Sequence, residues 1–156
     1  MFKEDNYKSL IETCPEVGLY LIINEIGGYL WHMNHGLSHG RIEDPTGSIV
    51  ESFPKCREQQ IQAVKQLQDR FGVPALESDG ETPTESYWKW FRWWDGYIKG
   101  LNDVEWKKLN DACAAHYKGE DVSLDEWRPE GEWQNHSGKF GDTYGQAVNS
   151  GENENK

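Results

Sequence analysis

Four tryptophans lie within the seven residues 88–94, and this crowding constrains the fold of the 156-residue chain more than any other feature. The run follows strong signals for the start of a helix. Thr82 can cap a helix N-terminus, Pro83 suits the first helical position, and Glu85 completes a capping box. The pattern predicts a helix over 83–100 that carries more aromatic rings than one buried face can hold.

Helical spacing divides these rings into two stripes. The first stripe is expected to face the core and comprises Tyr87, Phe91, Trp94, Ile98 and Leu101. The second stripe consists of Trp90, Trp93 and Tyr97, at positions where an ordinary surface helix carries Lys, Glu or Ala. Two interpretations stay open. Either other elements enclose every ring, or the second stripe is an exposed patch, rimmed by charged residues such as Arg92, of the kind found at protein interfaces.

Two neighbouring segments also predict helices. Pro54 suits a first helical position and predicts a helix over 54–71. Asn102 and Glu105 form a second capping-box pattern, which predicts a helix over 102–117. The connection between the last two helices is so short that they should form an antiparallel or steeply crossed pair.

Residues 17–53 allow two interpretations. Apolar runs on both sides of Gly27 and Gly28, with a turn signal at 44–47, indicate a small antiparallel sheet. The alternative is a helix that begins at Pro15 and has an apolar face at helical spacing. That helix would contain three glycines, each costing about 1 kcal/mol relative to Ala. We therefore predict an α+β fold in which the sheet packs against the three helices, with an all-α fold as the alternative.

Charge is distributed unevenly along the chain. Asp and Glu number 27 against 16 Lys and Arg, which gives a formal net charge of −11. Residues 120–156 hold nine of these acids against three basic residues. We predict one globular domain over 1–119, followed by an acidic, partly ordered segment over 120–156 with a disordered extreme end. The charge disfavours direct binding to nucleic acid or to an anionic membrane, and is compatible with a basic protein partner.

Three histidines with the spacing H-x2-H-x3-H, namely His32, His35 and His39, are candidate metal ligands. Three imidazoles could hold zinc or iron in an open catalytic site. However, two glycines in this segment indicate a loop, and no carboxylate accompanies the histidines as it does in H-E-x-x-H. We favour exposed loop histidines with no metal or other cofactor, and keep a metal-dependent enzyme as an alternative.

The three cysteines, Cys14, Cys56 and Cys113, are widely spaced and form no C-x-x-C motif. The N-terminus lacks the apolar stretch of a secretory leader, and the longest apolar run, 17–23, is too short to span a bilayer. These features predict a cytoplasmic protein with reduced thiols.

The function that these patterns favour is a non-enzymatic protein-binding module, an acidic inhibitor or adaptor that engages a basic, possibly nucleic-acid-binding partner. A mobile-element protein that blocks host machinery would fit this description by analogy. A structural homo-oligomeric subunit is a further alternative. The residues expected to contact the partner are Trp88, Trp90, Arg92, Trp93, Tyr97, Trp127 and Trp133.

Overall fold

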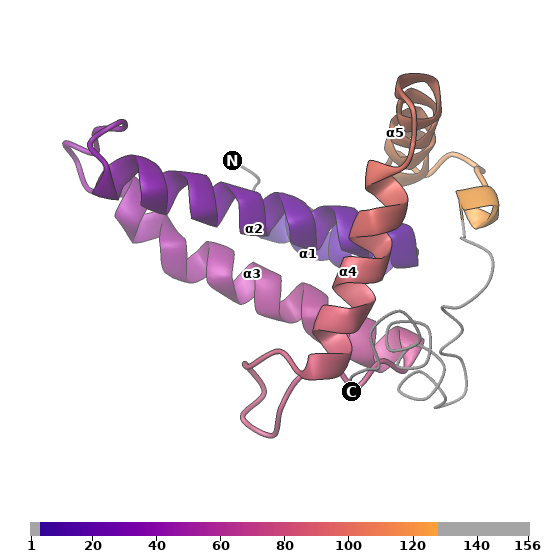
Figure 1. Ribbon diagram of the computed structural model, residues 1–156, viewed down its shortest axis with the longest axis horizontal. Coiled ribbons are helices and arrows are strands. Elements are labelled where there is room, and N and C mark those ends of the chain that lie inside the picture. The colour runs from indigo at the N-terminus through magenta and orange to yellow at the C-terminus, as the bar shows by residue number, and fades with distance from the viewer. Residues whose placement is uncertain (1–3, 128–156) are drawn as a thin grey trace.

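The computed structural model describes residues 4–127, and 72% of the structure is helical (Figure 1). The elements are α1 (Glu4–Thr13), α2 (Glu16–Ser38), α3 (Ser48–Phe71), α4 (Glu85–Lys99), α5 (Asp103–Tyr117) and the short 3-10 turn η1 (Asp125–Trp127). Over the described residues there is no strand, and one isolated bridge joins Leu76 to Pro83. The predicted α+β fold is therefore wrong, and the all-α alternative is correct.

The predicted sheet over 17–53 is replaced by α2 and the start of α3. Pro15 lies at the N-cap of α2 with an extended backbone. Gly18, which argued against a helix, occupies a position where a Cβ would lie 2.8 Å from the Cβ of Cys14 and 2.9 Å from the hydroxyl of Tyr117. Full burial of one large aliphatic side chain contributes about 1.5–3 kcal/mol. The buried face of α2 therefore outweighs the cost of its glycines.

The turn signal at 44–47 joins two helices rather than two strands. The carboxylate of Asp44 accepts hydrogen bonds from the backbone N–H groups of Ile49 and Val50, each at 3.1 Å. These bonds satisfy donors in the first turn of α3 that have no partner within the helix. Because of this cap, α3 begins at Ser48, before the predicted start at Pro54.

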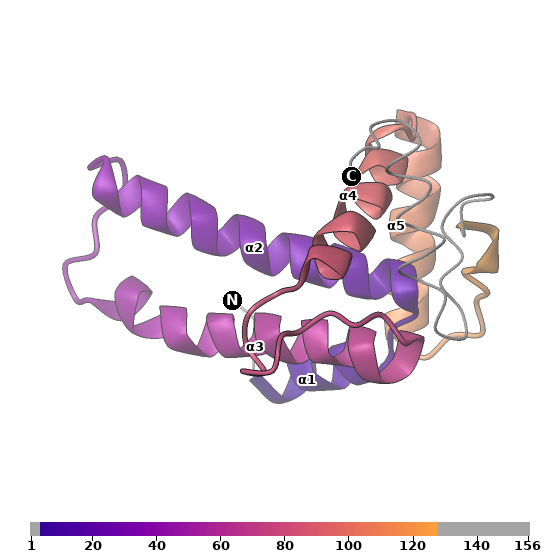
Figure 2. The same cartoon turned by 60° about the horizontal axis from the view of Figure 1, so that its bottom comes forward.

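The helices α2 and α3 lie side by side in antiparallel directions and form a long hairpin (Figure 1 and Figure 2). The helix α1 packs along one end of this hairpin, and α4 crosses α2 steeply at the same end, where α5 follows. The guanidinium of Arg70, near the end of α3, donates hydrogen bonds to the backbone carbonyls of Ile11 and Cys14. It thereby satisfies carbonyls at the C-terminus of α1.

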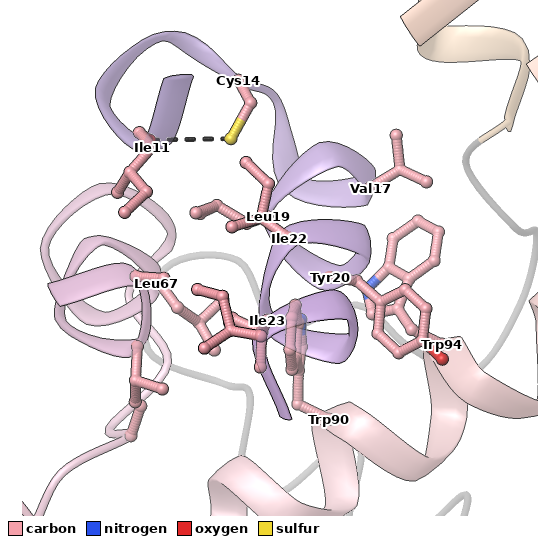
Figure 3. Close-up of a cluster of buried hydrophobic side chains, with 14 of the residues drawn as sticks. Ile11, Cys14, Val17, Leu19, Tyr20, Ile22, Ile23, Leu67, Trp90 and Trp94 are labelled. Atoms are coloured by element: carbon pink, nitrogen blue, oxygen red, sulfur yellow. Dashed lines mark hydrogen bonds between the residues drawn. The ribbon is translucent and has the colours of Figure 1, made fainter. Parts of the chain in front are cut away.

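The core lies at the end of the hairpin where α1, α4 and α5 converge (Figure 3). Its largest fully buried side chains are Trp90, Trp94, Tyr7, Tyr20, Ile11, Leu19, Ile23, Leu67 and Leu109. The opposite end of the hairpin has almost no core. Beyond Ile26 only Gly36 of α2 is buried, and no residue of α3 is buried before Cys56. We call this projecting part, residues 27–55, the hairpin arm.

The starts of α4 and α5 follow from their capping residues. The hydroxyl of Thr84 accepts a 3.0 Å hydrogen bond from the N–H of Tyr87, so α4 begins at Glu85, slightly later than predicted. The capping box predicted for the last helix is confirmed, since Asn102 and Glu105 each bond to the backbone of the other.

After α5, Leu124 and Trp127 are buried and join the core. The rest of the predicted acidic segment, from residue 128 onward, lies outside the described residues. This part includes Trp133, one of the predicted contact residues. Within residues 4–127, none of the helices combines the length and the apolarity needed to cross a lipid bilayer.

Candidate functional site

The tryptophan-crowded helix buries part of the face that its spacing predicted, and it buries Trp90 in addition. Trp90 and Trp94 are 0% and 1% exposed, and Tyr87 is buried beside them. Phe91, expected in the buried stripe, is only half-buried. On a helix, Tyr87 and Trp94 lie on one side with either Phe91 or Trp90, so a small rotation of α4 about its axis exchanges Phe91 for Trp90. Trp90 therefore lies in the core, where no partner protein can reach it.

A buried carboxylate accepts hydrogen bonds from two indoles of this face. The indole Nε1 groups of Trp90 and Trp94 both donate to Oε2 of Glu16, at 3.1 and 2.7 Å. Glu16 is 8% exposed and is the first residue of α2, where the helix dipole favours a negative charge. Buried indole N–H groups need an acceptor, and one oxygen serves both. Burial and these hydrogen bonds together account for both tryptophans as structural residues.

The remaining rings of the predicted second stripe are half-buried at the edge of the core. Trp93 packs edge-on against Trp94 with ring centroids 5.2 Å apart, and Tyr97 does so at 5.9 Å. Trp127, another predicted contact residue, is 8% exposed. The predicted second stripe is therefore not an open patch.

Trp88 is the exception on this helix, with 43% of its surface exposed. The ring of Trp88 packs edge-on against the ring of Tyr87, with ring centroids 4.9 Å apart, and this contact helps to orient it. Glu85 and Arg92 flank it at helical spacing and form an ion pair of 3.8 Å with both side chains largely exposed. An exposed pair of this kind contributes little stability. The carboxylate of Glu85 and the guanidinium of Arg92 can therefore exchange this contact for one with a partner beside the Trp88 ring.

The loop that leads into α4 is acidic and ordered. It carries Glu77, Asp79 and Glu81, and no Lys, Arg or His occurs from Phe71 to Trp88. The carboxylate of Asp79 accepts hydrogen bonds from the Thr82 hydroxyl and from two backbone N–H groups, and these bonds lower its pKa. Because the loop acids Glu77, Asp79 and Glu81 precede Trp88 by at most eleven positions in the chain, we group them with Glu85, Trp88 and Arg92 under the name Trp88 surface.

The acidic members of this surface were not predicted from the sequence, in which the loop reads only as a connection between helices. The available signal was a run of acids with no basic residue, directly before a tryptophan. Trp88 and Arg92 were predicted as contact residues together with Trp90, and spacing alone could not separate the exposed ring from the buried one.

The predicted histidine cluster lies at the end of α2 rather than in a loop. His32 and His35 are helical, and His39 is the C-cap residue. The ring of His35 stacks on Trp31 with centroids 3.8 Å apart, and the ring of His39 lies 5.6 Å further on. Among the described residues, no three His, Cys, Asp or Glu side chains are placed to hold one metal ion. The metal-dependent alternative gains no support from this geometry.

All three cysteines are buried and none forms a disulfide. Burial raises the pKa of the Cys14 thiol to about 12 and that of Cys113 to about 11. Burial also raises the pKa of Cys56, which lies in the interior of α3 and not at its N-terminus. Protonated, buried thiols are poor nucleophiles, so these side chains act as small apolar groups.

Comparison of the chain with protein-family models, with curated proteins and with solved structures gave no match.

Proposed function

We propose that this protein is a non-enzymatic binding module that docks a basic surface of a partner protein on its Trp88 surface. The observation that carries the proposal is the exposed, ring-supported Trp88 between Glu85 and Arg92, at the end of an acidic loop. Tryptophan and arginine are the residues that most often dominate binding energy at protein interfaces.

Charge supports the same partner class. Carboxylates in the loop and a net charge of −11 attract a basic protein over a range of about 8–10 Å at physiological salt. A partner that itself binds nucleic acid presents a surface of this sign. Added salt screens the attraction between opposite charges. The rate of association, and with it the affinity for such a partner, should therefore fall strongly as the salt concentration rises.

The test is affinity capture from the native host, with quantitative mass spectrometry of the retained proteins. Three variants are compared with the wild type: Trp88→Ala, the charge variant Glu77→Gln with Glu81→Gln and Glu85→Gln, and the control Trp106→Ala. Trp106 is 37% exposed on α5 and lies outside the Trp88 surface.

The proposal expects a basic protein that the wild type and the control retain, and that both other variants lose. Equal retention by all four proteins would refute it.

A further inference from the structure

The hairpin arm carries another exposed tryptophan, Trp31, which lies on α2 and not on α4. Trp31 is 56% exposed, more than any other tryptophan that the structure describes. The connection between α2 and α3 lies at the opposite end of the hairpin from α4 and α5 (Figure 1 and Figure 2). No other described helix covers this end of the arm, so its side chains are not needed to close the core.

Two hollows flank Trp31. The first, of about 350 Å³, is lined by Trp31 with His32, His35, His39 and Arg41. The second, of about 420 Å³, lies between α2 and α3 and is lined by Leu30, Trp31, Phe53 and Arg57 among others. Trp31 is common to both and forms the ridge between them.

The charge lining these hollows is opposite in sign to that of the whole molecule. Arg41 lines the first and Arg57 the second, and no Asp or Glu lines either one. Asp44, near Arg41 in the chain, is engaged at the start of α3 through its bonds to backbone N–H groups. In a chain of net charge −11, both hollows are thus lined by an arginine and by no carboxylate, and the exposed Glu43, two positions after Arg41, lines neither.

The first hollow is held in shape by the end of α2. Gly40 adopts a left-handed conformation with φ of 67°, and the N–H of Arg41 donates a 2.8 Å hydrogen bond to the carbonyl of Gly36. This pattern is a Schellman cap. Gly36 has no side chain to obstruct the returning chain, since a Cβ there would lie 2.3 Å from Cδ1 of Ile42. The cap thus places Arg41 beside the stacked rings of His35 and Trp31.

We propose that the hairpin arm, with the adjoining turn of α3 that carries Arg57, binds an acidic peptide segment of a partner protein. Carboxylates of the segment pair with Arg41 and Arg57, and an apolar side chain between them packs on the exposed part of Trp31. Arginine holds carboxylates through two parallel hydrogen bonds. A small anion would fill one hollow, whereas an extended segment crosses the ridge and reaches both. Together with the Trp88 surface, this site would make the protein an adaptor between a basic and an acidic partner.

The test uses a fluorescein-labelled peptide of about twelve residues that repeats Glu-Glu-Phe, with a Gln-Gln-Phe peptide of the same length as control. Fluorescence anisotropy measures binding to the full chain. We expect the acidic peptide to bind, and the control peptide to bind at least about tenfold more weakly. Trp31→Ala should weaken binding of the acidic peptide by about tenfold or more, as expected for a truncated anchor residue.

The double variant Arg41→Gln with Arg57→Gln should also weaken binding of the acidic peptide by about tenfold or more, since this variant removes the charges that pair with the peptide. Trp106→Ala should bind like the wild type, because Trp106 lies on α5, outside both the Trp88 surface and the two hollows. Circular dichroism melting of each variant verifies folding.

Four results would overturn the inference. They are no binding of the acidic peptide, equal binding of both peptides, unchanged binding by the Trp31 and arginine variants, or equal loss in Trp106→Ala. Sedimentation tests a second copy as the occupant, because a dimer that Trp31→Ala abolishes would assign the arm to self-association instead.

Discussion

The indole of Trp94 donates a 2.7 Å hydrogen bond to Oε2 of Glu16, which joins α4 to the first residue of α2 across 78 positions of the chain. The same oxygen accepts from Trp90 at 3.1 Å. These bonds, together with the 2.6 Å hydrogen bond that Tyr20 of α2 donates to Asp95 of α4, constrain the rotation of α4 about its own axis. That rotation decides which tryptophans are core and leaves Trp88 at the surface.

Removing this carboxylate should destabilise the protein. Glu16→Ala leaves two buried indole N–H groups without their acceptor, and each unsatisfied buried donor costs about 1–3 kcal/mol. We expect the free energy of unfolding, measured by urea denaturation, to fall by about 3 kcal/mol. Glu16→Gln keeps an acceptor oxygen and should cost less. Glu12→Ala, at an exposed position of α1, is the control and should change stability by under about 0.5 kcal/mol. A small effect of Glu16→Ala would mean that other contacts orient α4.

Two tryptophans of α4 should have different roles, one in stability and the other in binding. Trp90→Ala empties a fully buried site and should lower the free energy of unfolding by about 3–5 kcal/mol. Trp88→Ala removes an exposed ring and should lower it by about 1 kcal/mol or less. Thermal or urea unfolding of the two variants measures the difference. Similar losses in both would show that Trp88 is a structural residue and would weaken the proposed function.

The buried thiols make stability dependent on alkaline pH. An exposed thiol titrates at about pH 8.5, whereas in the folded protein the pKa of Cys113 is about 11 and that of Cys14 about 12. Below about pH 8.5 both the folded and the unfolded state keep the proton, and no stability is lost. As pH rises through the window up to the folded-state values, the unfolded state releases its protons first, so folding weakens.

Each such group should remove about 1.4 kcal/mol per pH unit within its window. Burial also raises the pKa of Tyr87 and Tyr117, and they add to the loss at higher pH. Urea unfolding at pH 7, 9 and 10 measures this decline. Cys113→Ala removes one titrating group, so the free energy of unfolding should decline less steeply with pH in this variant. An unchanged slope would contradict the raised pKa of Cys113.

Local sequence signals predicted part of this fold. The capping box at Asn102 and Glu105 is a contact between near neighbours, and so it was visible in the sequence. The buried face of α4 was not, because helical spacing places Tyr87 and Trp94 beside Phe91 and beside Trp90 equally well. The contacts that distinguish the two come from distant residues such as Glu16, which lies 74 positions before Trp90. The candidate sites share this difficulty: exposure of Trp88 and Trp31 depends on how distant helices pack.

The glycines of α2 explain why its helix was mistaken for strands, and two of them give a matched test. In an exposed helix interior, Ala is more favourable than Gly by about 1 kcal/mol. A Cβ added at Gly28 would meet no neighbouring side chain or helix within 4 Å, so Gly28→Ala should stabilise the protein by about 0.5–1 kcal/mol. Gly18 lies against Cys14 and Tyr117, with Cβ approaches of 2.8 and 2.9 Å.

Gly18→Ala should therefore destabilise the protein by about 1–3 kcal/mol, as overpacking does, despite the better helix propensity. Urea unfolding of both variants gives the two signs. A stabilising Gly28→Ala and a destabilising Gly18→Ala would show that the absence of a side chain at Gly18 permits close packing. The packing partners are Cys14, just before α2, and Tyr117 at the end of α5. Stabilisation by both substitutions would mean that the contact at Gly18 relaxes without cost.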